Sequence, residues 1–520
     1  MKGIYERVIS FKEAEEMCSR ISGIAAGSEE VPVPAAVGRV ASEDIYSPAD
    51  NPPFNRATMD GFAMKSADSL PADGRKERSL KVIGESFIGE IPRKLSGIRT
   101  CMKISTGAMV PDGADCVVPI EEVTVNGDEI ILKGRMEPGE NVAPAGSDIK
   151  KGDLLLRSGT RIGFPEIAVL SAVGIPRIRV KRQLKIAIVS TGSELVMPGS
   201  PASFGKIFES NGLTISALLN SYSGIRADFL GILPDNYEAT EKKLISIAHE
   251  YDLIITSAGT SYGEKDYVYK VLQNSENGLI FHGIMVKPGM PTALGKIGQC
   301  HVIALPGFPV SALMILLSLF LPPLLKATGC DSELKHIRAV LGTEVRRDHN
   351  KWNLIPVILI ADRTIVAVPV HGLSGSISRF LNTSGYISLE PGDVVPAGTE
   401  VEVTLFGRSE NIKRPVLFGR VNNSLVRALD SFKVSLKTVK SDEDTAVRLL
   451  RGSLADAACL SSEYIALHPE VLREFNAIRL SDLEQSRETE QRGSDPKIAL
   501  YLVLPSGSDL LSAVGRNTTA

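Results

Sequence analysis

The feature that most constrains the fold is a regular alternation of short apolar segments and helix-like segments between Leu184 and Gly329. The apolar segments have the length and composition of buried strands: KIAIVSTG, ADFLGILPD, YDLIITSAG, LIFHGIMVKPG and HVIALPG. The segments between them, such as EATEKKLISIAHEY, space their apolar residues as an amphipathic helix does. This alternation predicts a doubly wound parallel sheet that is covered by helices on both faces. Ligands of such sheets bind at the carboxyl ends of the strands.

The sequence before this region follows a different pattern. Residues 1–50 begin as an amphipathic helix and continue through a proline-rich passage, and residues 141–182 carry a helix before a basic strand. From 51 to 140, short strand-like segments are broken by Gly and Pro, which predicts a small β-rich lobe. Alternation on both sides of Asn126-Gly127 predicts a hairpin with a type I′ turn there.

The sequence after the α/β region first returns to strand-like alternation. Residues 331–407 predict a small β-barrel or sandwich, and residues 408–520 suggest another α/β layer. The fold class is therefore multidomain α/β plus β, which agrees with a prior of about 150 residues per domain for a chain of 520.

Charge, cysteines and apolar runs exclude several classes of protein. Lys and Arg number 58 against 61 Asp and Glu, so nothing favours non-specific binding to nucleic acid or to an anionic membrane. The six cysteines form no CxxC pair, which argues against a cysteine metal cluster or a thioredoxin-like motif. The N-terminus does not read as a signal peptide, and the apolar run from Ala312 to Leu321 is too short to span a bilayer. We therefore expect a cytoplasmic protein, with that run in a core helix.

Three loops follow predicted strands of the α/β region and carry residues suited to binding phosphate: STGSEL (190–195), TSAGTSYGEKD (256–266) and KPGMP (287–291). Small residues expose backbone N–H groups, and these can bind an anion together with a helix N-terminus. Lys287 would balance the anionic charge, and nearby carboxylates would require a hard cation such as Mg²⁺; they are Glu194, Glu209, Asp235 and Asp266. Any one such loop is most often a simple turn, but three in one sheet favour a site.

A second group of polar residues lies in the β-rich regions. Asp60 stands in PPFNRATMDGFAM, Thr106 precedes Gly107 in ISTGAMVPDGADCVV, and Asp148 lies in AGSDIKKGD. Their types and spacing alone indicate only turn residues, because Asp and Gly are common in turns for local hydrogen-bonding reasons.

Taken in order, seven segments resemble the molybdopterin molybdenumtransferase family, whose members are related to the gephyrin E domain: NRATMDGFA, ISTGAMVPDGADCVV, AGSDIKKGD, VSTGSEL, TSAGTSYGEKDY, VKPGMPTALG and LPGFPVSA. The resemblance covers roughly residues 5–407. It implies an elongated N-terminal domain (1–50 and 141–182), a β-rich lobe (51–140), a molybdopterin-binding α/β domain (183–330) and a C-terminal barrel (331–407). It also implies a homodimer whose active cleft combines the α/β domain of one subunit with the β-rich lobes of the other.

The activity that the resemblance implies is the insertion of molybdenum from molybdate into adenylylated molybdopterin, with release of AMP and with Mg²⁺ or a similar divalent ion. The implied catalytic residues are Asp60, Thr106, Asp148, Asp235, Asp266 and Lys287. Glu194, Asp235 and Asp266 would gather the cation. The pterin and its phosphates would be held by Thr191, Gly192, Ser193, Glu194, Ser257, Gly259, Thr260, Ser261, Gly263, Pro306, Pro309, Ser376 and Ser378. The two prolines are equally well explained as simple turn prolines.

The sequence departs from the family pattern at five places. Ala258 replaces the first Gly of a usual Ser-Gly-Gly, and Met290 replaces the second Lys of a usual KPGKP. The loss of that cation weakens an oxyanion site unless Lys265 or Arg379 compensates. The other departures are Glu209-Ser210-Asn211 for Asp-Thr/Ser-Asn, Phe308 for Asn or Tyr, and Thr383-Ser384-Gly385 for Ala-Asp-Gly.

Two other functions remain open at this point. The α/β region alone is also similar to a molybdopterin adenylyltransferase, which would otherwise be a partner that supplies the substrate. Alternatively, the chain is a non-catalytic pterin-binding or scaffolding dimer, a reading that Ala258 and Met290 motivate. Phrases in 408–520 resemble a periplasmic-binding-protein-like domain, but the segment is too short for two lobes, which favours a single reduced lobe.

Overall fold

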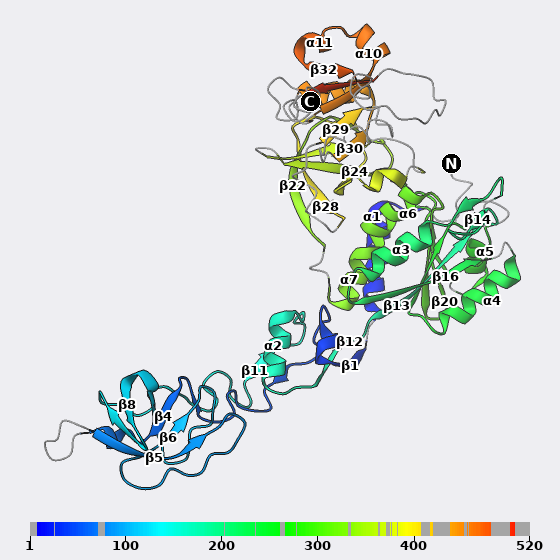
Figure 1. Ribbon diagram of the computed structural model, residues 1–520. Helices are drawn as coiled ribbons and strands as arrows, with labels where there is room; N and C mark the ends of the chain where they lie inside the picture. Colours follow the sequence, from blue (N-terminus) through cyan, green and yellow to red (C-terminus); the bar gives the residue numbers. More distant parts are fainter. Residues whose placement is uncertain are drawn as a thin grey trace. The chain divides into compact units, whose positions relative to one another are not determined.

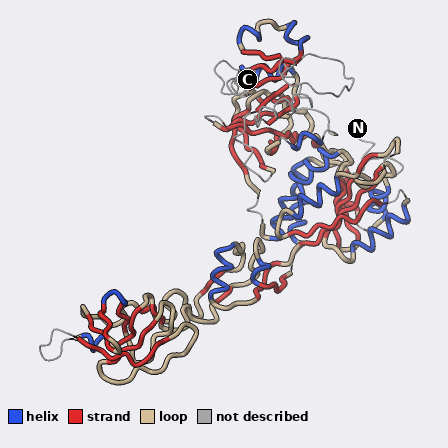
Figure 2. The backbone as a smooth tube through the Cα atoms, in the orientation of Figure 1, coloured by secondary structure: helices blue, strands red, loops and turns tan. Residues whose placement is uncertain are grey.

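The computed structural model divides the chain into two compact units, which Figures 1 and 2 show as ribbon and tube. One unit is 27–182; the other comprises 1–26 and 183–520. The structure describes residues 8–24, 27–70, 78–201, 203–233, 236–259, 266–276, 278–330, 334–361, 364–370, 375, 377–381, 383–406, 416–419, 437–451, 455, 457–479 and 500–504.

The α/β domain is built on a six-stranded sheet with the order β16-β13-β17-β21-β20-β18. Its strands are β13 (Leu184–Thr191), β16 (Ile225–Leu233), β17 (Leu253–Ser257), β18 (Leu279–His282), β20 (Ala293–Ile297) and β21 (Cys300–Leu305). The four strands from β16 to β21 are parallel, whereas β20 and β18 run antiparallel to their neighbours. The predicted doubly wound sheet is confirmed, but the expectation that all its strands are parallel is wrong at this edge. There no helix separates β18 from β20 or β20 from β21, so the chain makes no helical crossover between these strands.

Helices pack on both faces of this sheet. In Figure 1, α4 (Tyr237–Ala248) and α5 (Tyr267–Asn274) lie on one face, and α3 (Asn211–Asn220) and α6 (Pro309–Ile315) lie on the other. The α4 and α5 face shares one buried core with alternate residues of the central strands, Ala187 and Val189 among them. The helix α1 (Phe11–Ser19) also belongs to this unit, with Ser10 and Glu13 forming a capping box at its start. Residues 11–23 therefore differ from the expected grouping of 1–50, because α1 and the turn after it pack on α7 and its preceding turn rather than on the N-terminal domain.

A single long helical stretch follows β21. It runs through α6, a π-helical turn (Leu316–Phe320) and α7 (Leu321–Thr328). Pro322 and Pro323 lack N–H groups and stand in the first turn of α7, directly after the π-helical turn. Among the described residues, this stretch is the one helix that is long and apolar enough to cross a membrane. Within the protein, 72% of its most apolar 18-residue segment is buried. Such burial is the property of the core helix that the sequence predicts here.

The C-terminal domain contains a closed five-strand barrel. The ring is formed by β24 (Trp352–Ala361), β25 (Ile365–Pro369), β22 (His336–Leu341), β28 (Glu400–Leu405) and β26 (Gly385–Leu389), and it closes because β26 also pairs with β24. Two short strands, β23 (Val345–Arg346) and β27 (Val394–Val395), form a separate pair. Alternate strand residues such as Val357, Ile387 and Val403 fill the barrel interior.

The tail forms the predicted α/β layer on the outside of the barrel. Its sheet has the order β30-β29-β31-β33-β32. The elements are β29 (Val416–Gly419), β30 (Lys437–Lys440), α9 (Glu443–Arg451), β31 (Ala457–Ser461), α10 (Ser462–Leu467), α11 (Val471–Glu474), β32 (Asn476–Arg479) and β33 (Leu500–Leu504). One buried cluster joins Phe418, Val447 and Leu460 of this layer to Ile358 and Val368 of the barrel. The tail and the barrel therefore share a core; the likeness of the tail to a periplasmic-binding-protein lobe stays a prediction.

Two of the buried cores described in the unit 27–182 mark its two parts. One lies under α2 (Phe164–Ala172) and the strand pairs β1 (Ser28–Pro32) with β12 (Arg177–Lys181) and β2 (Ile45–Tyr46) with β11 (Leu154–Leu156). The other is formed by buried side chains of a six-stranded sheet with the strand order β7-β4-β6-β5-β9-β8. Its strands are β4 (Gly61–Met64), β5 (Arg78–Ser86), β6 (Thr100–Ile104), β7 (Cys116–Pro119), β8 (Val123–Asn126) and β9 (Glu129–Leu132).

The predicted hairpin is confirmed between β8 and β9, but the position and the type of its turn differ from the prediction. Asn126 pairs with Glu129, so the two turn residues are Gly127 and Asp128. Only Gly127 of these two has a positive φ, +61°, whereas a type I′ turn needs positive φ at both central positions. The turn begins one residue later than the sequence suggests.

Candidate functional site

The ends of β13, β17 and β21 form the centre of the candidate site. Thr191 ends β13, and its Oγ1 lies 3.5 Å from the carbonyl oxygen of Ser257, which ends β17. Gly259 has a φ of +80°, and a Cβ there would lie 3.2 Å from Thr191 Oγ1. These three predicted site residues are therefore brought together, as the carboxyl ends of neighbouring parallel strands must be.

The loop after β13 holds its carboxylate close to its own backbone. A Cβ on Gly192 would lie 2.6 Å from Glu194 Oε1, so the Glu194 side chain folds over this glycine. The φ of Gly192 is +145°, a conformation that other residues rarely adopt. Lys206, which the sequence did not single out, donates from Nζ to the carbonyl oxygen of Ser193. A cation thus lies beside this loop.

Ala258 occupies a backbone conformation that favours glycine. Its φ is +68°, in the left-handed region, where a Cβ crowds the following carbonyl oxygen. The family pattern has Gly at this position, and the structure supplies the physical reason. A Cβ on Gly307, after β21, would lie 3.3 Å from Ala258 Cβ, so the loops after β17 and β21 lie against each other.

A polar network at the start of α3 joins these strand ends. Asn211 Nδ2 donates to Ser257 Oγ at 2.8 Å and to the carbonyl oxygen of Gly307 at 2.7 Å. Glu209, 2% exposed, accepts hydrogen bonds at Oε1 from Ser190 Oγ (2.6 Å) and from the backbone N–H of Gly212 (2.7 Å). The sequence singled out Glu209 as a carboxylate near the phosphate loops and Asn211 only as part of a departure from the family pattern; an Asn directly after the helix N-cap was the signal of its role.

The Lys287 loop belongs to another sheet than the one predicted. Val286 and Lys287 form β19, which pairs in parallel with Trp352 and Asn353 of the barrel strand β24. The expectation that KPGMP follows a strand of the parallel sheet is therefore wrong, because the chain leaves that sheet after β18. Gly289, with a φ of +112°, lies against Ile315 of α6, since a Cβ there would be 2.2 Å from Ile315 Cγ1.

Prolines and a barrel turn complete this edge. Pro306 is buried directly after β21, and Pro309 is the first residue of α6, the helix position that tolerates a missing N–H best. The barrel approaches at Gly375, where a Cβ would lie 3.7 Å from Cδ1 of the exposed Phe308. Ser378 lies exposed in the turn that follows, Ile377–Leu381. These contacts bring a barrel turn next to the loop after β21.

The acidic residues predicted for the N-terminal unit form a group of their own. Asp60 Oδ1 accepts hydrogen bonds from the backbone N–H of Thr106 at 2.6 Å and from its Oγ1 at 3.0 Å. Both donations favour the ionised form and lower the pKa of the Asp60 carboxyl. Asp148 Oδ2 accepts from Asn51 Nδ2 at 2.9 Å.

Backbone hydrogen bonds connect the loops that carry these three residues. Ala57 N–H donates to the carbonyl oxygen of Ala108, and Thr58 N–H donates to that of Asn141. Gly146 N–H donates to the carbonyl oxygen of Pro52. The structure thus brings Asp60 and Thr106 into direct contact and places Asp148 on an adjoining loop.

Several predicted residues lie outside the described part of the chain: Asp235, Thr260, Ser261, Gly263, Lys265 and Ser376. Asp266 is the N-cap of α5. Within the described ranges, no three His, Cys, Asp or Glu side chains are grouped as a metal site. The cation site at Glu194, Asp235 and Asp266 therefore stays a prediction.

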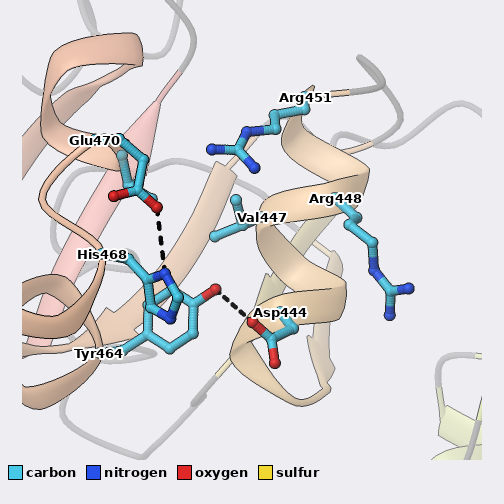
Figure 3. A pocket seen from close by; sticks show the side chains of 8 residues that line it. Asp444, Val447, Arg448, Arg451, Tyr464, His468 and Glu470 are labelled. Atoms are coloured by element: carbon cyan, nitrogen blue, oxygen red, sulfur yellow. Dashed lines mark hydrogen bonds and ion pairs between the residues drawn. The ribbon is translucent and has the colours of Figure 1, made fainter.

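A separate hollow of about 380 Å³ lies in the tail, between α9 and the segment of α10 and α11 (Figure 3). Its polar groups are largely paired with one another or with a neighbour. Tyr464 Oη donates to Asp444 Oδ1 at 2.7 Å, and burial together with this carboxylate raises the pKa of Tyr464. His468 Nδ1 lies 3.2 Å from Glu470 Oε1, and Arg451 makes two hydrogen bonds to Glu474. Sequence reasoning did not find this hollow, because its residues follow no motif.

Three family models match successive parts of the chain. They are the MoeA N-terminal region (domain I and II) over 9–174, a probable molybdopterin binding domain over 187–326, and the MoeA C-terminal region (domain IV) over 338–406. Among curated relatives, a molybdopterin molybdenumtransferase of Haemophilus influenzae is 36% identical over 68% of this chain and 88% of its own length. A molybdopterin molybdenumtransferase 2 of Mycobacterium tuberculosis is 29% identical over 72% and 94%.

A solved structure agrees with these matches. The molybdopterin biosynthesis MoeA protein of Pyrococcus horikoshii superposes with a TM-score of 0.66 at 36% identity, over 77% of this chain and 99% of that one. The likeness extends over the N-terminal regions, the α/β domain and the barrel, and the matched family models end at residue 406.

Proposed function

This chain belongs to the molybdopterin molybdenumtransferase family and is an enzyme of molybdenum cofactor biosynthesis, and we propose that it transfers molybdenum from molybdate to adenylylated molybdopterin with release of AMP. The observation that carries the proposal is the joining of three strand ends at one edge of the molybdopterin-binding sheet. Thr191 Oγ1 lies beside the carbonyl oxygen of Ser257, and Asn211 joins Ser257 to Gly307. Such an edge presents backbone N–H groups to a phosphate-bearing ligand.

The chain's own residues would position the phosphates. Gly192, Gly259 and Ala258 turn the backbone sharply after their strands, which exposes main-chain N–H groups where side chains are small. Lys206, beside the Ser193 carbonyl, adds positive charge at the same loop. Positioning and charge neutralisation supply most of what cleavage of a phosphoanhydride requires.

We propose that a divalent cation such as Mg²⁺ binds to carboxylates of this edge. Glu194 follows β13 and Asp266 precedes α5 after the neighbouring strand β17, and carboxylate oxygens are the ligands that Mg²⁺ prefers. Together with Asp235 they would hold the ion, which supplies positive charge to the pyrophosphate when bound. The folding of Glu194 over Gly192 keeps one of these carboxylates at the loop.

Asp60 would act in metal insertion from the N-terminal unit. The two hydrogen bonds from Thr106 keep its carboxylate ionised, so it can orient water or organise metal insertion but cannot donate a proton near neutral pH. Asp148 and Lys287 would complete the site, with Ser376 and Ser378 from the barrel. The enzyme would work in the cytoplasm as a homodimer whose cleft is shared between subunits, and a molybdopterin adenylyltransferase would supply its substrate.

Molybdate-dependent release of AMP from adenylylated molybdopterin tests the proposal. Asp60→Ala is expected to lower the rate about 100-fold, the scale of losing one charged group that acts in the transition state. Asp68→Ala is the matched control, because Asp68 accepts a backbone N–H from Arg99 in the same lobe and should leave the rate within about 3-fold.

Three outcomes of that assay would contradict the proposal. Adenylylation of molybdopterin by ATP without molybdate would instead identify an adenylyltransferase. Tight pterin binding without turnover would identify a scaffold. Near-wild-type release of AMP by Asp60→Ala would remove the role of Asp60.

A further inference from the structure

Asn211 stands where α3 begins and spans two strand ends with one side chain. It is the first residue of the helix, after the N-cap Ser210. One amide proton goes to Ser257 Oγ at 2.8 Å and the other to the carbonyl oxygen of Gly307 at 2.7 Å. Since β17 and β21 are neighbouring parallel strands, this amide sets the spacing of the loops that follow them.

The helix turn that carries Asn211 is itself held by Glu209. The Glu209 carboxylate is almost fully buried and accepts from Ser190 Oγ of β13 and from the backbone N–H of Gly212. A negative charge before the first turn also interacts favourably with the helix dipole. The position of the Asn211 amide is thus determined by a third strand, β13.

The contact from Asn211 decides what Ser257 can do. Ser257 is 3% exposed, and its Oγ accepts a proton from Asn211. A hydroxyl carries one proton to donate, and an accepted hydrogen bond directs that proton away from the donor. In the part of the chain that the structure describes, Ser257 Oγ donates no hydrogen bond to another protein group.

We propose that Asn211, held by Glu209, is a positioning residue that orients the Ser257 hydroxyl as a donor to the phosphate-bearing ligand. This inference rests on the proposed function, because it takes the strand-end edge as the ligand site. Asn211 acts through Ser257 and through the Gly307 carbonyl, and it has no amide proton left to donate to the ligand, since both are already used.

A double-mutant cycle in the full-length protein tests the coupling. Asn211→Ala and Ser257→Ala are each expected to lower kcat/KM for adenylylated molybdopterin about 10-fold, mainly through KM, because one ligand hydrogen bond is lost in either case. The double variant should be no worse than either single one. Asn211→Asp keeps the size but cannot donate and adds a negative charge, so it should lower kcat/KM at least as much as Asn211→Ala.

Asn220, at the other end of α3, gives a matched control. Its Nδ2 also makes two hydrogen bonds, to the Ala227 carbonyl oxygen and to Ser216 Oγ. Asn220 Oδ1 also accepts from the backbone N–H of Ala227, so Asn220→Ala should destabilise the domain at least as much as Asn211→Ala does, yet leave KM unchanged. A KM for Asn220→Ala as high as that for Asn211→Ala would show that both act only through stability and would overturn the inference.

Two further results would contradict the positioning role: a wild-type kcat/KM for Asn211→Ala, or additive losses in the double variant. Pterin fluorescence titration with adenylylated molybdopterin separates this inference from the proposed function. If the wild type binds the ligand without turnover, the proposed function fails, and the same cycle in Kd decides the role of Asn211. If the wild type does not bind the ligand, both fail.

Discussion

Ala258 allows the conformation of one loop residue to be measured as a stability difference. Its φ of +68° lies in the left-handed region, which costs an L-residue with a Cβ about 1–2 kcal/mol. Ala258→Gly removes this cost but adds conformational freedom to the unfolded chain, which opposes folding by about 0.5–1 kcal/mol. The net expectation is a gain of about 0.5–1 kcal/mol in the free energy of unfolding.

An Ala→Gly substitution at Ala217 serves to separate the native-state part of the stability change at residue 258 from the unfolded-state part. Ala217 is exposed within α3, in ordinary helical conformation, so Ala217→Gly should lose about 1 kcal/mol. The unfolded-state change is common to both variants, and the difference of about 1.5–2 kcal/mol therefore reports the backbone at 258.

Native-state hydrogen exchange of the β17 amides supplies the measurement, because buried central strands exchange only when the domain opens. Opposite changes in the opening free energy are expected for the two variants. Equal losses in both would refute the reasoning, since they would mean that residue 258 has no left-handed strain to relieve. A higher opening free energy for Ala217→Gly as well would refute the expected loss of helix stability at that position.

Two further predictions concern the Asp60 pair and the tail. Thr106→Ala should raise the pKa of Asp60 toward its ordinary value, because the Oγ1 donation is lost while the backbone N–H remains. A carboxyl whose pKa is lowered by folding stabilises the protein above that pKa, and this stability is lost as the pH falls through it. The Thr106→Ala variant should therefore lose less stability on acidification than the wild type. Titration of the Asp60 carboxyl ¹³C signal measures the pKa, and an unchanged pKa would contradict the prediction. Phe418→Ala should lower the free energy of unfolding by about 3–5 kcal/mol, because Phe418 belongs to the core that the tail and the barrel share. For the same reason, hydrogen exchange should become faster at the β25 amides as well as at those of the tail. Faster exchange confined to the tail would show two separate cores.

Local patterns in the sequence were enough to predict the main helices and strands and many of the candidate site residues. The alternation of apolar segments predicted β13, β16, β17 and β21, because period and length are properties of a few consecutive residues. The loops after β13 and β17 were found for the same reason, since Gly and Ser at a strand end have a local conformational cause. Asp60 and Thr106 came only from motifs, and their hydrogen bonds show why the two occur together.

Pairings between distant segments were decided by the tertiary structure. Lys287 follows a strand-like segment, yet β19 pairs with β24 of the barrel, because a strand's partner depends on which edge remains open after folding. The tail packs on the barrel because both sheets leave an apolar face that a single layer cannot bury. The sequence by itself thus determined which segments are strands, helices and anion-binding turns. Only the folded chain decided that Asn211 reaches Ser257 and Gly307, since those contacts join residues 46 and 96 positions apart.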